Sequence, residues 1–268
     1  MNIEEAARLI KKRPADAHKG VFGKALLCVG SYGMMGAAVL SARACLRSGV
    51  GLCYVCSPER CMDIMQISVP EAVFRMSLEN LQQYDAVGCG CGLGTGAEAV
   101  NKLEYILDNV SKPLLLDADA LNIISANLWQ GRLPKGTVIT PHPLEFQRLS
   151  GTGGSREEQI KAAQAFAVKY GVVVVLKGAG TAVVNTDGTV QINTTGNSGM
   201  ATAGSGDVLS GIITSLLAQG YEPYNAARLG VYLHGLAGDI AAAEHSEQSL
   251  IASDIIDSIG ECFKKFRS

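Results

Sequence analysis

Short apolar runs alternate with helical repeats along most of this chain. Apolar runs typical of strands occupy residues 25–29, 51–56, 86–89, 114–116, 138–140 and 172–176. Helical spacing of apolar positions follows at residues 36–48, 98–109 and 155–170, and three further helices are expected toward the C-terminus. The strand-like runs are continuously apolar, which indicates strands buried on both faces of a parallel sheet. The pattern therefore predicts an α/β fold with three layers, α/β/α, around a mostly parallel central sheet.

Two local signals refine this prediction. Residues Ser155 to Glu158 have the form of a capping box, in which a serine and a glutamate satisfy backbone groups at a helix start. The Asp187-Gly188 pair at the centre of residues 181–193 predicts a hairpin at the sheet edge. No long linker, internal repeat or low-complexity segment divides the 268 residues. We therefore expect a single domain over residues 1–268.

Charge and hydropathy exclude several classes of partner. The formal net charge is −2 and no basic run is present, which disfavours nucleic acids and anionic membranes as partners. No apolar run reaches the roughly 18 residues that a membrane-spanning helix needs. Residues 1–10 are charged and amphipathic, unlike a signal peptide. These features predict a cytoplasmic protein.

Eight cysteines raise the question of a metal site or of disulfides. Cys53 and Cys56 form a C-x-x-C pair, but they fall on a predicted strand, where residues three apart point to opposite faces. No second pair follows at zinc-binding spacing. Cys28 ends a predicted strand, and Cys89 and Cys91 fall in a glycine-rich turn. Such positions are typical of reduced thiols that pack as small core residues, so we predict no thiol metal site.

The segment from Thr194 to Asp207 carries the clearest candidate chemistry. Gly204 and Gly206 allow the backbone to approach a ligand closely, and the free N–H groups of the following helix point at the same place. Asp207 adds a carboxylate at this helix start, which suggests phosphate chemistry. A capped helix after a glycine turn is the alternative, since a carboxylate there gains roughly 0.3–1 kcal/mol from the helix dipole without any further function.

Five polar or glycine-rich segments directly follow predicted strands. They are residues 30–38, 88–96, 117–122, 140–145 and 177–181. Ligands of open parallel sheets bind outside the carboxyl ends of the strands, so these segments should meet in one site. Each also has a structural alternative: Asp117 and Asp119 as turn or cap residues, His142 as a histidine in a rigid loop between prolines, and Lys177 as a solvated strand end. Their shared placement favours a site, although residues 30–38 match neither the dinucleotide nor the P-loop fingerprint.

A series of sequence blocks matches a known family in that family's order. The blocks are Lys19-Gly-x-Phe-Gly, Gly36-Ala-Ala-Val-Leu, Leu46-Arg-Ser-Gly-Val-Gly51, Gly92-Leu-Gly94, Leu116-Asp-Ala-Asp-Ala-Leu-Asn122, Thr140-Pro-His-Pro-x-Glu145, Lys177-Gly and Asn197-x-Gly-Met-Ala-Thr-x-Gly-Ser-Gly-Asp207. Across nearly its whole length the chain thus resembles the ADP- or ATP-dependent NAD(P)H-hydrate dehydratases. The resemblance implies a ribokinase-like fold. It also implies repair of the S epimer of hydrated NADH or NADPH (NADHX or NADPHX), with a nucleotide hydrolysed to phosphate.

The resemblance also implies roles for matching residues. The hydrated cofactor would contact Ala37, Gly94 and His142, with Gly92 close by, and Asp207 would face its reacting group. The nucleotide would be held by Lys177, Gly178, Ala179, Gly180, Thr181 and Gly206. The chain departs from the family's usual residues at four loop positions, Cys91, Leu144, Ser198 and Ala203, which spare the polar side chains. The epimerase domain that is fused in many relatives is not expected in 268 residues.

The chemistry requires a general base, donors for the transferring phosphoryl group and a divalent metal. Asp207 fits the base. The backbone amides of Gly204, Ser205 and Gly206 fit the stabilisation of charge, and Lys177 fits a phosphate contact. We expect phosphorylation of the C6 hydroxyl, followed by loss of phosphate driven by the ring nitrogen. Mg²⁺ is expected from phosphoryl chemistry alone, because no metal-ligand spacing is visible.

Two other functions fit the same residues. One is a ribokinase-like kinase that acts on a small molecule such as a vitamin alcohol and releases a stable product. The other is a nucleotide-sensing module without turnover, which the presence of Asp207 and Lys177 disfavours. The sequence leaves open the choice of ADP or ATP and of NADHX or NADPHX. The family resemblance implies a homo-oligomer, often a tetramer.

Overall fold

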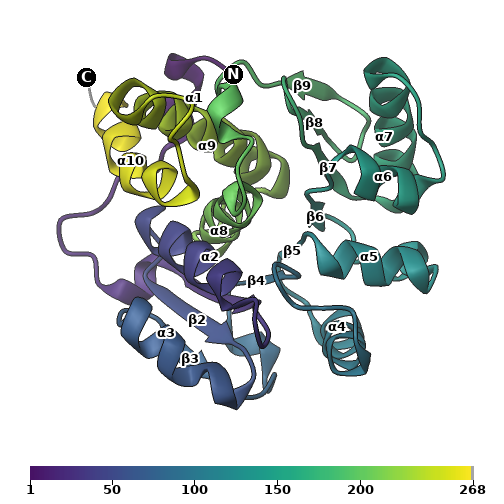
Figure 1. Ribbon diagram of the computed structural model, residues 1–268, viewed down its shortest axis with the longest axis horizontal. Coiled ribbons are helices and arrows are strands. Elements are labelled where there is room, and N and C mark those ends of the chain that lie inside the picture. Colours follow the sequence, from purple (N-terminus) through teal and green to yellow (C-terminus); the bar gives the residue numbers. More distant parts are fainter. Residues whose placement is uncertain (267–268) are drawn as a thin grey trace.

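A computed structural model describes residues 1–266, and one nine-stranded sheet forms its centre (Figure 1). The strands are β1 (Lys24–Cys28), β2 (Leu52–Cys56), β3 (Val73–Arg75), β4 (Ala86–Cys89), β5 (Leu114–Leu116), β6 (Val138–Ile139), β7 (Val173–Leu176), β8 (Ala182–Val184) and β9 (Val190–Ile192). Their order across the sheet is β3-β2-β1-β4-β5-β6-β7-β8-β9. All pairs from β3 to β7 are parallel, whereas β7–β8 and β8–β9 are antiparallel. The predicted parallel sheet with an edge hairpin is confirmed.

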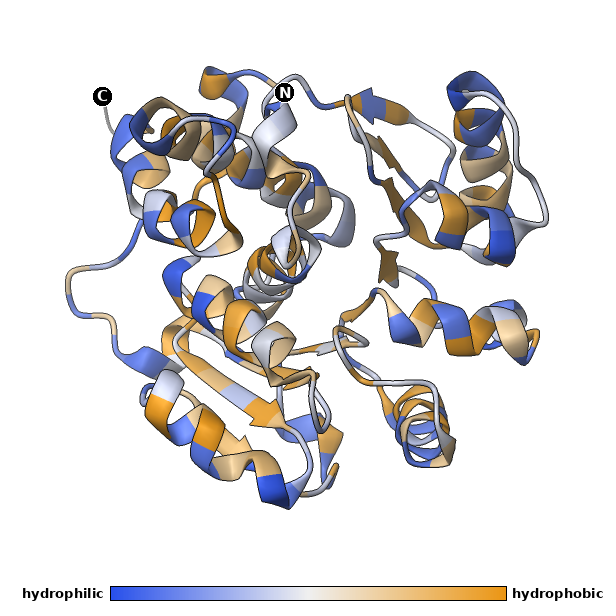
Figure 2. Ribbon diagram, viewed as in Figure 1, coloured by the Kyte–Doolittle hydropathy of each residue, from blue (hydrophilic) through white to orange (hydrophobic). Residues whose placement is uncertain are grey.

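Helices cover both faces of the sheet, as the three-layer prediction requires. They are α1 (Ile3–Leu9), α2 (Met35–Arg47), α3 (Met62–Ser68), α4 (Ala97–Asn109), α5 (Asp119–Ala126), α6 (Pro143–Ser150), α7 (Arg156–Tyr170), α8 (Ser205–Ala218), α9 (Pro223–His245) and α10 (Ala252–Lys265). One buried cluster joins the sheet to α2, α8, α9 and α10, and a second joins its other face to α4, α5, α6 and α7. Figure 2 shows that many of these helices have one apolar and one polar side, whereas the central strands are mostly apolar.

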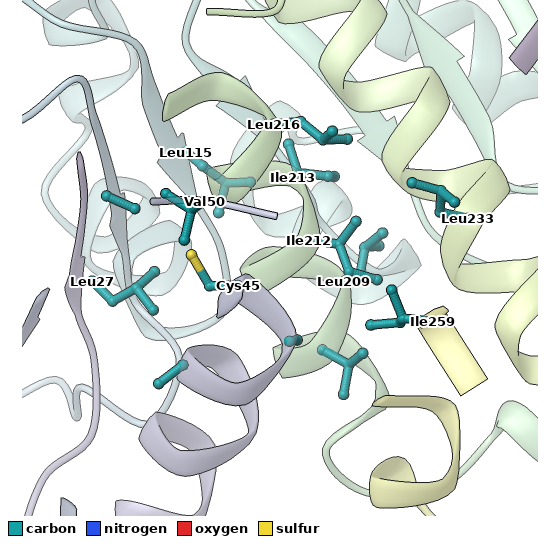
Figure 3. Packing of buried hydrophobic residues seen from close by; sticks show 14 of the residues in the cluster. Leu27, Cys45, Val50, Leu115, Leu209, Ile212, Ile213, Leu216, Leu233 and Ile259 are labelled. Atoms are coloured by element: carbon teal, nitrogen blue, oxygen red, sulfur yellow. The ribbon is translucent and has the colours of Figure 1, made fainter. Parts of the chain in front are cut away.

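Helix α8 is buried on nearly all sides and is the central element of the first cluster. Leu209, Ile212 and Leu216 pack between the sheet and the neighbouring helices α2 and α9 (Figure 3). Helices α2 and α8 approach so closely that a β-carbon on Gly211 would lie 2.2 Å from the carbonyl oxygen of Ser41. This packing holds α8 in place, and the segment from Thr194 to Asp207 leads into the first turn of this helix.

The structure corrects the expected elements at several places. Helices α3, α5 and α6 and strand β3 were not predicted. The helices have at most eight residues, about two turns, and the strand has three, so their apolar positions are too few to show a period. Cys89 is the last residue of β4 and does not lie in the turn that follows. The predicted packing of the cysteines as core residues is confirmed: Cys53 and Cys56 lie in opposite core clusters, and all eight thiols are free and buried.

The described residues bear on membrane-spanning helices and on clusters of metal-binding side chains. No helix within residues 1–266 is long and apolar enough to cross a membrane. Nor do the described side chains include a cluster of three or more histidines, cysteines or carboxylates arranged to hold a metal ion.

Candidate active site

The order of strands reverses direction between β1 and β4, and two loops meet at this switch point. After β1 the chain continues to β2 and β3 on one side, whereas β4 begins the series of strands on the other side. The Gly30 N–H donates to the carbonyl oxygen of Cys91 (2.8 Å), and the Ser31 hydroxyl donates to that of Gly92 (2.8 Å). A crevice outside such a point is the usual ligand site of open α/β sheets.

Three residues that the sequence assigned to the hydrated cofactor lie together at this switch point. Ala37, near the start of α2, packs so closely on Gly92 that a β-carbon there would lie 2.9 Å from the Ala37 Cβ. The Gly94 N–H donates to the carboxylate of Asp119 (2.8 Å), which begins α5. The capping role that the sequence left open for Asp119 is wrong, because α5 has no side-chain cap; instead Asp119 ties the loop after β4 to the loop after β5.

A cavity of about 840 Å³ opens beside this region, at the carboxyl ends of β5, β6 and β7. Most of the predicted site residues line it: His142, Lys177, Gly178, Ala179, Gly180, Thr181, Gly204, Ser205, Gly206 and Asp207. Residues 193–202 form a further wall. Among the described residues, Ala37, Gly92 and Gly94 lie outside this lining. The predicted residues thus form two adjoining groups, with Asp207 in the cavity and near the Cys91 thiol of the loop after β4, which acts to lower the pKa of Asp207.

A buried charged cluster lies on the floor of the cavity. The Lys177 ammonium donates to Oδ1 of Asp117 (2.8 Å) and lies 3.9 Å from Oε2 of Glu145. The Ser210 hydroxyl donates to the other oxygen of Asp117 (2.7 Å). Although burial acts to lower the pKa of Lys177, the two carboxylates raise it above its ordinary value. Lys177 is therefore a charged, partnered residue and not a solvated strand end.

The loops after β5 and β6 hold this cluster in place. Ala118 follows Asp117 with a φ of 49°, a strained conformation for a residue other than glycine and one that often accompanies functional sites. His142 caps α6, since its Nδ1 accepts from the N–H groups of Leu144 (3.2 Å) and Glu145 (3.3 Å). In return the Glu145 carboxylate accepts from the His142 N–H (2.8 Å). His142 is therefore a helix cap and not simply a histidine in a rigid loop between prolines, and its side chain also lines the cavity.

Asp207 lies in the first turn of α8 and is mostly buried. Burial raises its pKa above the usual range of an aspartate, and the negative charge of Asp117 adds to this, whereas Cys91 and Lys177 act in the opposite direction. A carboxylate with a raised pKa is a stronger base than an exposed one, which suits it to proton transfer.

The start of α8 is built to receive an anion. Gly204 precedes the helix in the left-handed conformation, with φ 88°, and no side chain caps the helix. The N–H groups of Gly206 and Asp207 donate to no acceptor within residues 1–266. Free N–H groups at a helix start, together with the helix dipole, attract negatively charged ligands.

Comparisons with known proteins agree with this geometry. Residues 25–261 match the model of the family described as NAD(P)H-hydrate dehydratase. The chain is 43% identical to the ADP-dependent (S)-NAD(P)H-hydrate dehydratase of Neisseria meningitidis serogroup B, over 87% of this chain and 81% of that protein. The chain belongs to the NAD(P)H-hydrate dehydratase family.

Solved structures of this dehydratase family and of its superfamily share the fold. The ADP/ATP-dependent NAD(P)H-hydrate dehydratase of Bacillus subtilis, co-crystallised with ATP/Mg²⁺, superimposes with a TM-score of 0.89 at 31% identity, covering 99% of this chain and 97% of that chain. A ribokinase-like superfamily protein of Enterococcus faecalis gives a TM-score of 0.91 at 31% identity, covering 99% and 95%. The predicted ribokinase-like fold is confirmed. The chain spans about half the length of the bifunctional NAD(P)H-hydrate repair enzymes that it also matches.

The candidate site contains residues that the sequence did not reveal. His234 of α9 lines the cavity, and its Nε2 lies 3.2 Å from the Ser205 hydroxyl. Burial lowers the pKa of His234 to about 4. His234 falls in an apolar helix without a flanking motif, so no sequence signal marks it. Ser210 follows Asp207 by three residues on α8, a spacing that places both on one helical face and offered a signal that was missed.

Proposed function

We propose that this chain dehydrates the S epimer of NADHX or NADPHX to NADH or NADPH, using ADP or ATP as phosphoryl donor. The observation that carries the proposal is the position of Asp207. Its carboxylate lies at the start of α8, next to free backbone N–H groups, and is close to the loop after β4 that adjoins Ala37 and Gly94. A base and an anion site at one helix start suit transfer of a phosphoryl group to a substrate hydroxyl.

In the proposed first step Asp207 takes the proton of the C6 hydroxyl of the hydrate. The hydroxyl oxygen then bonds to the terminal phosphorus of the nucleotide, and the bond from that phosphorus to AMP or ADP breaks. The amides at the start of α8 and the Lys177 ammonium face the charge that develops on the phosphoryl oxygens. In the second step the ring nitrogen lone pair expels phosphate from C6, and loss of a proton from C5 restores the double bond.

Two buried carboxylates fit the Mg²⁺ that phosphoryl transfer uses. Asp117 and Glu145 are 1% and 6% exposed and line the cavity beside Lys177. Magnesium prefers oxygen ligands and is commonly held by one or two carboxylates together with the phosphates of the substrate. We propose that Asp117 and Glu145 hold the ion, which when bound neutralises phosphate charge.

The residue roles proposed for binding match the two structural groups except at His142, which lines the cavity. Ala37, Gly92, Gly94 and His142 would contact the hydrated cofactor, and the loop 177–181 with Gly206 would hold the nucleotide. We further propose a cytoplasmic location, which the free, buried thiols support, and a homo-oligomer such as a tetramer, which light scattering on the purified protein tests.

Replacement of Asp207 tests the proposed base. We expect Asp207→Asn to lower kcat by about 10²–10⁴-fold, the usual contribution of a general base, while ADP and the hydrate still bind. Asp63→Asn, at an exposed position of α3, removes the same charge away from the site and should leave kcat unchanged. Near-normal turnover by Asp207→Asn would contradict the assignment.

Analysis of the products separates this function from its alternatives. The dehydratase releases inorganic phosphate and the reduced nicotinamide nucleotide. A vitamin-alcohol kinase would instead accumulate a phosphorylated product, and a nucleotide sensor would be stabilised by ADP or ATP without releasing phosphate.

A further inference from the structure

In the loop 177–181 most carbonyl groups accept hydrogen bonds, whereas the N–H groups of Gly178, Ala179 and Gly180 are free within the described chain. Arg156, the first residue of α7, donates from Nη1 to the carbonyl of Lys177 (3.1 Å) and from Nη2 to the carbonyls of Leu176 (3.0 Å) and Gly180 (3.0 Å). The Thr181 hydroxyl donates to the carbonyl of Gly178 (3.0 Å). The carbonyl oxygens of residues 176, 177, 178 and 180 therefore all accept hydrogen bonds from within the protein.

Three consecutive N–H groups of the same loop have no such partners, whereas the Lys177 N–H donates to the carbonyl of Pro141 (2.9 Å). Within the described chain, those of Gly178, Ala179 and Gly180 donate to no acceptor. Because the loop lines the 840 Å³ cavity, its unpaired donors are available to a ligand there. Consecutive free N–H groups in a turn attract anions.

The backbone conformation of the loop 177–181 depends on contacts that hold its two glycines. Gly178 has φ 137° and Gly180 has φ 65°, and glycine is flexible enough to leave either conformation when nothing holds it. A β-carbon on Gly178 would lie 3.6 Å from Nη1 of Arg156, so the guanidinium packs directly against this turn. Hydrogen bonds from a charged donor are stronger than those between neutral groups, and three of them come from one planar group.

Arg156 is itself held rigidly at the helix start. The hydroxyl of Ser155 accepts from the Glu158 N–H (3.3 Å), and the Glu158 carboxylate accepts from the Ser155 N–H (2.7 Å), which completes the capping box predicted from the sequence. Partial burial lowers the pKa of Arg156, although a guanidinium remains charged in proteins. No carboxylate within the described residues pairs with this guanidinium, which donates instead to the backbone carbonyls of Leu176, Lys177 and Gly180.

We propose that Arg156 is a positioning residue that shapes the nucleotide-binding loop. By bonding the carbonyls of Leu176, Lys177 and Gly180, it turns the N–H groups of residues 178–180 toward the phosphates of a nucleoside diphosphate or triphosphate. It also fixes the backbone of Lys177, whose ammonium pairs with Asp117. Arg156 contacts neither substrate nor reacting atoms. The proposal rests on the proposed function in one respect, that the loop binds the nucleotide.

Calorimetric titration with ADP tests the proposal without requiring turnover. We expect Arg156→Ala to raise the Kd for ADP by about tenfold or more, as loss of several charged hydrogen bonds that preorganise a site would do. In turnover assays the KM for the nucleotide should rise in parallel, while kcat and the KM for the hydrated cofactor change less than about threefold. Added guanidinium ion should restore part of the ADP affinity of Arg156→Ala and leave the wild-type protein unaffected, a response that a merely structural role would not give.

Two further variants make the outcome unambiguous. Lys161→Ala removes a cation from the exposed side of the same helix, where Lys161 pairs only with Glu157 (2.9 Å), and should leave the ADP affinity unchanged. If Arg156→Ala does not fold, Arg156→Lys decides, since it keeps the charge but lacks the planar fork. A Kd at least threefold weaker supports the proposal.

An ADP affinity within twofold of wild type in folded Arg156→Ala, or in Arg156→Lys where only that variant folds, overturns the proposal. Failure of the wild-type protein to bind ADP would instead overturn the proposed function, so the two failures are distinguishable.

Discussion

Two glycines at the start of α8 should respond to alanine in opposite ways. Gly204 has φ 88°, and a β-carbon there would lie 2.4 Å from Cδ1 of Leu40. The left-handed conformation costs a non-glycine residue about 1–2 kcal/mol, and overpacking adds about 1–3 kcal/mol. Because Cδ1 is the end of a side chain that can shift, we expect Gly204→Ala to lower the free energy of unfolding by about 2–3 kcal/mol. In a domain of this size that lowers Tm by about 4–12 °C.

Gly206 is two residues further along, within the helix, and its φ is not positive. A β-carbon there would lie 3.5 Å from Nζ of Lys177 and 3.9 Å from Oδ2 of Asp117, both ordinary contacts. Alanine is favoured over glycine in a helix by about 0.5–1 kcal/mol, so Gly206→Ala should be at least as stable as the wild-type protein. Its methyl group, however, enters the cavity beside Lys177, where we place the phosphates.

The two variants are compared by urea unfolding and by calorimetric titration with ADP. We expect Gly204→Ala to lose stability, and Gly206→Ala to keep stability and bind ADP at least tenfold more weakly. The reasoning would be refuted if Gly206→Ala bound ADP within twofold of wild type, or if it lost as much stability as Gly204→Ala.

Three further predictions concern ionisation and access. Because burial raises the pKa of Asp207 and a general base acts when deprotonated, kcat/KM should fall on acidification with a midpoint above the ordinary value of about 3.9; a profile flat down to pH 4 would contradict this. Burial lowers the pKa of His234 to about 4, so its folded state binds fewer protons than its unfolded state between that value and about 6.5. Its contribution to stability is full above that window and declines as the pH falls through it, and an NMR titration that protonates His234 near pH 6.5 would exclude the buried neutral form. All eight thiols are buried, and a disulfide reagent should modify them only after unfolding; rapid modification of the native protein would show that one is accessible.

Much of the fold follows from the sequence because the parallel strands are continuously apolar. Such runs have few alternatives to a sheet covered on both faces, and β4 and β5 begin and end at the predicted residues. Short elements were missed because their formation depends on tertiary contacts. Helix α6, for example, has eight residues and begins at a histidine cap that also belongs to the site.

Some residues of the candidate site could likewise be predicted from the sequence, and others could not. Lys177, Asp207 and the glycine segments follow strands or open a helix, so their placement at one sheet edge could be predicted. Arg156 and His234 reach the site from helices distant in sequence, and only packing of the layers brings them there. The structure also shows that the predicted residues form two adjoining groups, one at the switch point and one lining the cavity. The sequence did not predict this division.

The central claim is tested most directly by incubating the protein with enzymatically hydrated NADH and either ADP or ATP in the presence of Mg²⁺. Absorbance at the reduced-nicotinamide band and inorganic phosphate are followed together. The account predicts that absorbance returns and that one phosphate is released for each NADH restored, with the S epimer alone consumed. A phosphorylated product that accumulates without return of absorbance, or phosphate release that does not depend on the hydrate, would contradict it.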